Sequence, residues 1–153
     1  MRLTVRTNLA MRALMTCAVH APDLVRKSDI ARVCNGSEAH FGLIVNQLAQ
    51  TGLICTVRGR RGGLKLALPA DEIVVGHVFR LFESSVPFTE CFAGGEDDCP
   101  IKSACRLRGA LERALEAFYA ELDKVTLADL VHGNSGLGSL LAFPVAEARS
   151  GPH

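Results

Sequence analysis

Residues 37–68 read SEAHFGLIVNQLAQTGLICTVRGRRGGLKLAL, and the hydrophobic pattern changes its period near the middle of this stretch. In the first half, apolar side chains recur at helical spacing, at Phe41, Ile44, Val45 and Leu48. We expect a helix that is capped by Ser37 and ends near Gln50. From residue 53 the pattern becomes that of two short strands, separated by the turn sequence RGRRGG. This order predicts a helix followed by a β-hairpin.

The preceding residues predict two more helices, from Leu3 to Ala18 and, after a cap at Ser28, from Asp29 to Val33. Between the second and third helices, Cys34-Asn35-Gly36 predicts a turn, because Asn and Gly tolerate positive φ. Two helices joined by a short turn with glycine form a helix-turn-helix, and the hairpin after it completes a winged helix. We therefore predict a mainly α fold with a small β-hairpin wing, and a winged helix-turn-helix DNA-binding domain over residues 1–83. The first helix has an apolar stripe, expected to be buried, of Val5, Leu9, Ala13, Leu14 and Cys17.

The second half of the chain predicts a loop over residues 84–104, where Ser, Pro, Gly and acidic residues dominate. A long helix is expected from Ser103 to Leu122, and we assign residues 105–131 to this dimerisation helix and a short helix after it. An alternative interpretation is that part of the apolar stripe on this long helix covers the chain's own domain and does not contact a partner. We expect residues 132–153 to form a flexible C-terminal tail. The stripe, which is the predicted dimer interface, consists of Leu107, Leu111, Leu115, Phe118 and Leu122.

The formal net charge of +1 over 153 residues hides a difference between the two halves. Residues 1–68 hold ten Lys or Arg against three Asp or Glu, a net charge of +7, whereas residues 69–153 carry a net charge of −6. A basic half is typical of a module that binds a polyanion such as DNA. Because no apolar run could span a membrane and no apolar core follows the N-terminus, we expect a cytoplasmic protein.

The predicted hairpin tip combines three arginines with glycines that let the backbone approach a surface closely. Arginine enters narrow minor grooves, where the potential is most negative. The candidate DNA-binding residues of the tip are Arg58, Arg60, Arg61, Gly62 and Gly63. On the preceding helix, the polar side chains suited to the major groove are Ser37, Glu38, His40, Asn46 and Gln47.

Six cysteines in a chain expected to be cytoplasmic favour metal or redox chemistry over disulfides. Cys91, Cys99 and Cys105 share one loop, with seven and then five residues between them, and the loop ends where the long helix begins. Three thiolates suit an iron–sulfur cluster or zinc, and the spacing is wider than that of zinc-finger pairs, which favours a cluster. We expect the remaining cysteines, at positions 17, 34 and 55, to be small buried hydrophobic residues.

Three features together resemble a known family: the Met1–Thr4 start, the Val57–Gly63 wing and the three-cysteine loop. They are similar to the winged-helix iron–sulfur regulators that include NsrR, IscR and RirA, over about residues 1–131. The resemblance implies a repressor that is a homodimer, binds a two-fold operator in double-stranded DNA, and carries a 4Fe–4S cluster in preference to a 2Fe–2S one. Val45–Leu48 and Thr126–Leu130 resemble NsrR, the nitric-oxide sensor. The cysteine spacing and Asn8 resemble RirA, the iron-responsive regulator.

Two positions depart from what the resemblance implies for a fourth cluster ligand. NsrR-type proteins supply an aspartate from the partner's first helix, where this chain has Asn8. IscR-type proteins place a histidine three residues after the third cysteine, where this chain has Arg108. The fourth ligand is therefore left open among water, a small thiol and a carboxylate such as Glu90 or Asp97.

The sequence thus favours a cluster-controlled repressor that senses nitric oxide, with iron or redox status as the alternative signal. A metal-dependent enzyme is a weaker hypothesis, because no His-Cys or Ser-His constellation lies at an obvious site and the basic half would have no role. A metal-free DNA-binding module with structural thiols is the third hypothesis, and an anaerobic absorption spectrum would distinguish it from the first.

Overall fold

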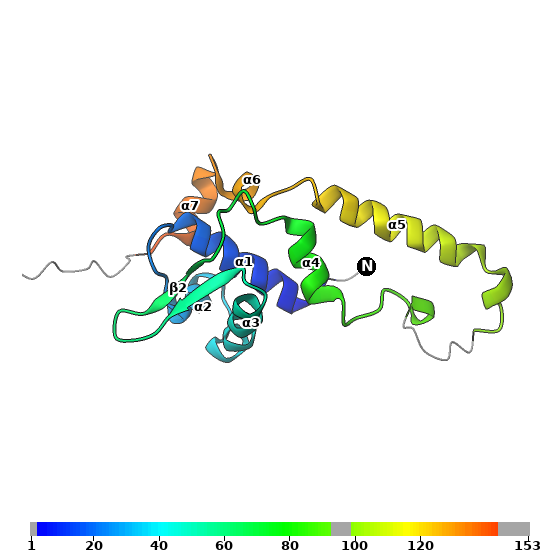
Figure 1. Ribbon diagram of the computed structural model, residues 1–153, viewed down its shortest axis with the longest axis horizontal. Helices are drawn as coiled ribbons and strands as arrows, with labels where there is room; N and C mark the ends of the chain where they lie inside the picture. The colour runs from blue at the N-terminus through cyan, green and yellow to red at the C-terminus, as the bar shows by residue number, and fades with distance from the viewer. Residues whose placement is uncertain (1–2, 93–98, 144–153) are drawn as a thin grey trace, which may run out of the picture.

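A computed structural model describes residues 3–92 and 99–143 of this mostly helical protein (Figure 1). Its helices are α1 (Val5–Val19), α2 (Lys27–Val33), α3 (Glu38–Gln50), α4 (Val75–Glu83), α5 (Arg106–Leu122), α6 (Leu127–Val131) and α7 (Ser135–Leu141). The strands β1 (Ile54–Val57) and β2 (Gly63–Leu66) form an antiparallel hairpin. Short 3₁₀ turns cover Glu90–Phe92 and Lys102–Ala104. This order of elements confirms the predicted winged helix-turn-helix class.

Helix α1 is the central element of the DNA-binding unit and packs against α3, α4, α6 and β2. Thr4 caps it, since the Thr4 side chain accepts a hydrogen bond from the Thr7 backbone at 3.3 Å. The predicted apolar stripe is buried except at its first member, Val5, whose side chain is 68% exposed. The expectation for Val5 is wrong because Thr4 and Thr7, on another side of the same turn, are the residues that contact Glu83 of α4.

The turn between α2 and α3 has the predicted geometry, with Asn35 at a φ of 51°. Gly36 is required for a second reason, because a Cβ there would lie 2.5 Å from the fully buried ring of Phe41. The cap predicted at Ser28 is wrong: the Ile30 amide already donates to the Arg26 carbonyl at 3.1 Å, so the helix begins two residues earlier than predicted, at Lys27.

The hairpin is held to the helices by a third extended segment. Val25 and Leu64 exchange two backbone hydrogen bonds, at 2.9 and 2.8 Å, and both side chains are buried. Gly63 lies at this junction, where a Cβ would approach the Val25 carbonyl to 2.9 Å. The base of the wing is therefore fixed, while its tip extends away from the body (Figure 1).

Helix α5 extends away from the DNA-binding unit and has no buried residue in the single chain (Figure 1). It begins at Arg106 and not at the predicted Ser103, because residues 102–104 form a 3₁₀ turn. Its C-terminal end is fixed to α4 by Arg80, which donates to both Asp123 oxygens at 2.6 and 2.7 Å. This hydrogen bonding lowers the pKa of Asp123 below its usual range. Gly76 makes room, since a Cβ there would lie 2.1 Å from the Asp123 carboxylate.

After α5 the chain returns to the DNA-binding unit. The Leu127 amide donates to the Ile73 carbonyl at 2.8 Å, and both side chains are almost completely buried. Thr126 and Asp129 form a capping box at the start of α6, and its hydrogen bonds lower the pKa of Asp129. Helix α6 packs against α1, so the core of the DNA-binding unit includes residues beyond the predicted boundary at 83.

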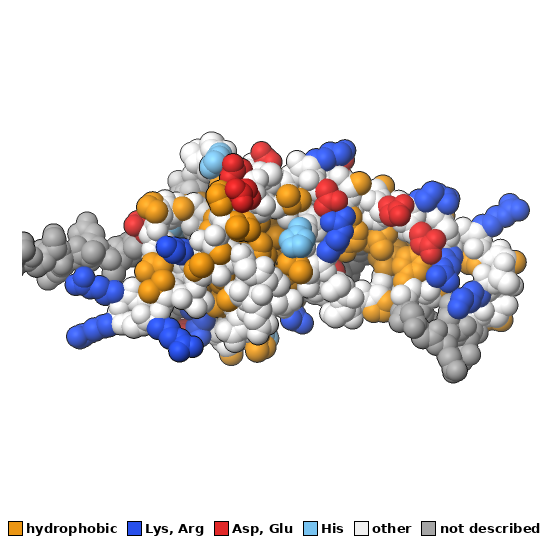
Figure 2. All heavy atoms as spheres, viewed as in Figure 1, with side chains coloured by type: hydrophobic (Ala, Val, Ile, Leu, Met, Phe, Trp, Pro, Cys, Tyr) orange, Lys and Arg blue, Asp and Glu red, His pale blue; other side chains and the backbone are white. Residues whose placement is uncertain are grey.

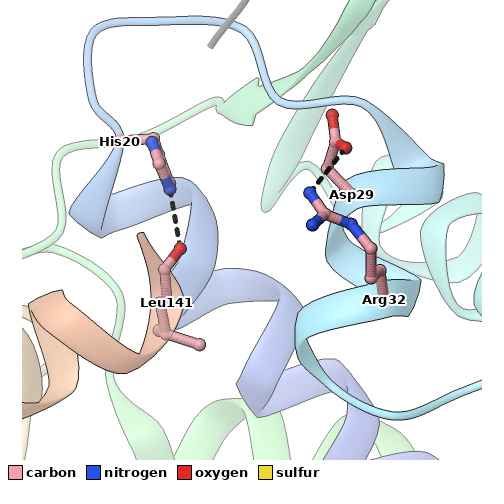
Figure 3. Close-up of polar contacts among 4 residues, drawn as sticks. All are labelled: His20, Asp29, Arg32 and Leu141. Atoms are coloured by element: carbon pink, nitrogen blue, oxygen red, sulfur yellow. Dashed lines mark hydrogen bonds and ion pairs between the residues drawn. The ribbon is translucent and has the colours of Figure 1, made fainter. Parts of the chain in front are cut away.

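The prediction of a flexible tail from residue 132 is wrong for the described part of that segment. Residues 135–141 form α7, and Leu141 is buried against the body. Figure 3 shows the His20 ring directed at the Leu141 carbonyl, at 3.0 Å, and Phe143 stacks on the same ring at 4.1 Å between centroids. The sequence of α7 has only weak helical periodicity, and a cap at Asn134 together with these contacts to α1 fixes it.

Candidate nucleic-acid interface and cysteine loop

One face of α3 is buried and the opposite face is exposed. Phe41, Ile44, Val45 and Leu48 point into the core, as predicted. Ser37 caps the helix by accepting from the His40 amide at 3.3 Å. The exposed residues of the face that points away from the core are Glu38, Ala39, His40, Leu43 and Asn46. This face is free, in the single chain, to enter a major groove.

Gln47 differs from the other polar candidates on α3 because its amide is engaged inside the protein. Its oxygen accepts from the Arg6 guanidinium at 2.6 Å, and its nitrogen donates to the Leu81 carbonyl at 3.2 Å. The side chain is half-buried and connects α3 to α1 and α4. Gln47 therefore positions α3 in this structure, whereas Asn46 beside it is exposed.

The tip of the wing is a tight turn that exposes its three arginines. Gly59 has a φ of +112°, and the Gly62 amide donates to the Gly59 carbonyl at 2.9 Å. A Cβ at Gly62 would lie 2.1 Å from the Val57 carbonyl oxygen, so only glycine fits there. Figure 2 shows Lys and Arg side chains at the end of the molecule that carries the wing, and a second group over α5 at the other end. The fully exposed arginines of the tip are Arg58, Arg60 and Arg61.

Sequence reasoning missed two residues near α3. Lys27 at the start of α2 is exposed, and its ammonium would lie 3.8 Å from a Cβ at Gly42 on α3. Leu43 is an apolar side chain that is 68% exposed. The hydrophobic periodicity of the sequence could have indicated that Leu43 is exposed, because position 43 falls outside the buried stripe of α3.

The three loop cysteines lie along the segment that joins α4 to α5. Cys91 is in the 3₁₀ turn 90–92, Cys99 opens the next described segment, and Cys105 is the N-cap residue of α5. Cys99 is exposed and the other two are half-buried. Within residues 3–92 and 99–143, no three metal-ligating side chains lie close enough together to hold an ion. Among the alternatives for a fourth ligand, Asp97 and the side chain of Glu90 lie outside what the structure describes.

The donor set nevertheless fits a cluster chemically. Helix α5 begins without a side-chain cap at Cys105, so its first amides and positive dipole end are available to a negatively charged group. The Thr89 hydroxyl lies 2.9 Å from the Cys91 sulfur and can donate to a thiolate there. Asn8 occupies the position from which NsrR-type proteins supply a fourth ligand. It is exposed on α1 and directed away from the core of its own chain.

Two of the remaining cysteines are buried, as predicted, and one is not. Burial raises the pKa of Cys17 to about 12, and the Cys34 thiol adds to the rise. Burial also raises the pKa of Cys34, against the opposing effects of Thr16 and Arg12. Both are poor ligands at neutral pH because metals bind the thiolate. Cys55 is exposed on β1 opposite Lys65, so the expectation that it is buried is wrong.

Two aromatic side chains of the loop lie near each other, and one of them lies near α5. The rings of Phe88 and Phe92 lie 6.1 Å apart, and the Arg108 guanidinium is 6.0 Å from the centre of Phe92. A cavity of about 280 Å³ lies between the end of α4, this loop and the middle of α5. Leu115 and Glu83 both line it.

The basic wing, the exposed face of α3 and the helix-turn-helix define a winged-helix DNA-binding protein. A comparison with protein families matches residues 3–133 to Rrf2, described as iron-dependent transcriptional regulators. The chain belongs to the Rrf2 family. It is a transcriptional regulator, not an enzyme. Among the described residues, no helix combines the length and apolar character needed to cross a bilayer.

Relatives and solved structures agree with this assignment. The chain is 43% identical to Protein aau3 of Rhizobium meliloti, over 94% of this chain and 93% of that one. It is also 43% identical to the HTH-type transcriptional regulator NsrR of Geobacillus kaustophilus, over 92% of this chain and 97% of the relative. The oxidised form of Staphylococcus aureus CymR has a TM-score of 0.69 at 26% identity, over 86% of this chain and 97% of that one. For T. potens IscR the TM-score is 0.68 at 24% identity, over 85% of each chain, a likeness of fold.

Proposed function

We propose that this regulator is a homodimeric repressor whose affinity for a two-fold DNA operator is controlled by an iron–sulfur cluster, with nitric oxide as the signal. The observation that carries the proposal is the three-cysteine loop, which connects the DNA-binding unit to a long helix without buried side chains. The near full-length similarity to an NsrR supports the choice of signal.

Cys91, Cys99 and Cys105 would hold the cluster, which supplies an iron centre that reacts with nitric oxide. The uncapped start of α5 offers amide donors to its negative charge, and the Thr89 hydroxyl offers a hydrogen bond to Cys91. Asn8 is exposed one turn after Val5 on α1, so it is available to a partner subunit. A neutral amide is a weaker iron ligand than the aspartate of NsrR-type proteins. We therefore expect the cluster of this chain to be less stable than a cluster with an aspartate ligand.

The dimer is proposed to form through the first half of α5. Leu107 and Ile101 expose 64% and 62% of their side chains, which is costly for large apolar residues in water. Toward the other end of α5, Phe118 lies 6.2 Å from the ring of Phe79, and Leu122 packs on the core. The C-terminal members of the predicted stripe thus pack within their own chain. The members that remain for a partner are Leu107, Leu111 and Leu115.

The end of α4 is the element through which the cysteine loop would act on DNA binding. The loop begins directly after Glu83, and the Glu83 carboxylate accepts from the Thr4 amide at 2.9 Å and from the Thr4 and Thr7 hydroxyls of α1. Two residues earlier, the Leu81 carbonyl accepts from Gln47 of α3. A change in the loop that displaces this turn thus displaces both the start of α1 and the helix that faces DNA.

The proposal is tested with protein reconstituted anaerobically and an operator selected in vitro from random duplexes. Operator binding is measured by fluorescence anisotropy during titration with nitric oxide. We expect a loss of affinity of about tenfold or more, within the usual range of coupling between two sites. Cys99→Ser should abolish both the cluster absorption and this response, and Cys55→Ser, also at an exposed thiol, should keep both. Operator binding that does not respond to nitric oxide would contradict the choice of signal.

Iron status is the second candidate signal, and the exposed Asn8 amide favours it. A cluster without a strong protein ligand at its fourth iron should lose iron to a chelator readily. If a chelator alone releases the operator within minutes and nitric oxide adds nothing, the regulator responds to iron. Absence of any cluster absorption after reconstitution would instead contradict both versions and leave a metal-free DNA-binding module.

A further inference from the structure

We infer that Leu43 reads the methyl group of a thymine in the operator, and so determines part of the sequence that this regulator recognises. The inference rests on the proposed binding of an operator, and it assigns a specificity role to a residue that the polar pattern of α3 does not suggest. It starts from the exposure of Leu43, 68% of whose side chain is open to water in the middle of α3.

The position of Leu43 makes it central to the DNA-facing surface. Its neighbours on the exposed face are Ala39 one turn before and Asn46 one turn after, both exposed. Gly42 beside it has no side chain, which lets this part of the helix approach another surface closely. A helix that enters a major groove with this face would bring Leu43 to the base edges, between Ala39 and Asn46.

The basic groups around this face favour DNA as its occupant. The ammonium of Lys27 would lie 3.8 Å from a Cβ at Gly42, so a cation flanks Leu43, while the one acidic residue of the face, Glu38, lies in the first turn of α3. Figure 1 shows the wing, with its exposed arginines, on the same side of α1 as α3. A protein partner that fits this face would need an apolar surface surrounded by negative charge. A major groove has phosphates along its edges and base edges between them.

The chemistry of leucine leaves one feature of the bases for it to recognise. The side chain has no donor or acceptor, and it penalises base edges whose amino or carbonyl groups it would strip of water. The thymine methyl is the apolar group that the major groove presents. Asn46, three residues on, can bind adenine through two hydrogen bonds. Together the two side chains specify A·T pairs under the centre of α3.

The test compares thymine with deoxyuridine, which lacks only the methyl group. Operators selected in vitro are synthesised with deoxyuridine at each thymine in turn, and the dissociation constant of the full-length protein, in the cluster state that binds DNA more tightly, is measured for each. At one position per half-site we expect the loss of the methyl to weaken wild-type binding about fourfold, the value of one buried methyl-sized group.

Leu43→Ala should bind the thymine and deoxyuridine operators equally at that position. Leu140→Ala, which removes a leucine that is 78% exposed on α7, should keep the wild-type ratio and so controls for the loss of an exposed leucine. Circular dichroism checks that both variants are folded. If no thymine is sensitive to loss of its methyl, or if Leu43→Ala keeps the sensitivity, the inference is overturned while operator binding stands. Failure to bind any selected duplex would instead overturn the proposed function, and the inference with it.

Discussion

Gly42 stands in the interior of an exposed helix face, where glycine destabilises a helix relative to alanine. We predict that Gly42→Ala raises the free energy of unfolding by about 0.5–1 kcal/mol. Within the described part of the chain, and apart from the helix's own backbone, the one atom within 4 Å of the new Cβ is the Lys27 ammonium nitrogen at 3.8 Å, so the fold accepts the methyl. Operator affinity should fall, because the methyl separates α3 from the bases.

Chemical denaturation and anisotropy measure the two effects on the same preparation. Gly138→Ala is the matched control, since Gly138 lies within α7 with open space around it. It should stabilise the protein by a similar amount without changing operator affinity. If both variants bind the operator as tightly as the wild type, the surface around Gly42 does not approach DNA.

Cys17 predicts a dependence of stability on pH. Its pKa is raised by burial to about 12 in the folded protein, from an ordinary value of 9.0. Below pH 9 the thiol is protonated in both states, so its full contribution to stability is present there. Between pH 9 and 12 the unfolded chain loses this proton while the folded one keeps it, so stability falls by about 1.4 kcal/mol per pH unit. Urea denaturation at several pH values should give a shallower decline for Cys17→Ala, and identical declines would contradict the buried, protonated thiol.

The wing illustrates what an element adds beyond its residues. Its three arginines are exposed on a turn fixed by Gly62, so they can reach phosphates or a minor groove irrespective of sequence. We predict that Arg60→Ala and Arg61→Ala weaken binding to specific and random duplexes alike. Each lost phosphate contact should reduce the slope of log affinity against log salt by about 1. Lys124→Ala, in the turn between α5 and α6, should leave the slope unchanged. If the arginine variants keep the wild-type slope, the wing does not contact DNA.

Helix α5 carries the prediction on assembly. Leu107→Glu places a charge on a side chain that is already 64% exposed in the single chain, so the fold should survive. Burial of a leucine in an interface contributes about 1.5–3 kcal/mol, and a symmetric dimer loses this twice. Light scattering should therefore report monomers at micromolar concentration, with an unchanged helical circular dichroism signal. Leu140→Glu on α7 should stay dimeric. A dimeric Leu107→Glu would mean that the interface lies elsewhere.

The elements of this fold could be predicted from the sequence wherever one local pattern determined them. The periodicity of Phe41 to Leu48, the turn at Asn35 and the capping box at Thr126 each depend on neighbours within a few residues. The wrong predictions concern features that depend on contacts between distant residues. Helix α7 is held by His20, and the exposure of Cys55 depends on the pairing register of β1 with β2. Gln47 has the polarity of a base reader, and its partners Arg6 and Leu81 become visible only in three dimensions.

At the scale of the whole molecule, the end of α4 connects the cysteine loop to the DNA-facing helices. We predict that Glu83→Gln lowers stability by about 1.5–3 kcal/mol, as expected when hydrogen bonds to a charged group are weakened. It should also shrink the ratio of operator affinities measured with and without the cluster. Glu121→Gln is the control, because the Glu121 carboxylate forms a solvent-exposed ion pair with Lys124 at 2.6 Å. A full response to nitric oxide in Glu83→Gln would show that the signal reaches DNA by another route.

The return of the chain to α1 after α5 has a genetic consequence. Leu127, which closes the core over Ile73, is encoded downstream of the sensing loop and of the long helix. A stop codon anywhere within α5 therefore yields a truncated chain that lacks Leu127. In this chain the hydrophobic core of the DNA-binding unit is exposed to water. If the chain acts as the proposed repressor, truncated alleles should behave as loss of repression, with the target genes switched on permanently. A permanently repressed strain that ignores the signal would then require a change that keeps residues 127–141, such as a missense substitution.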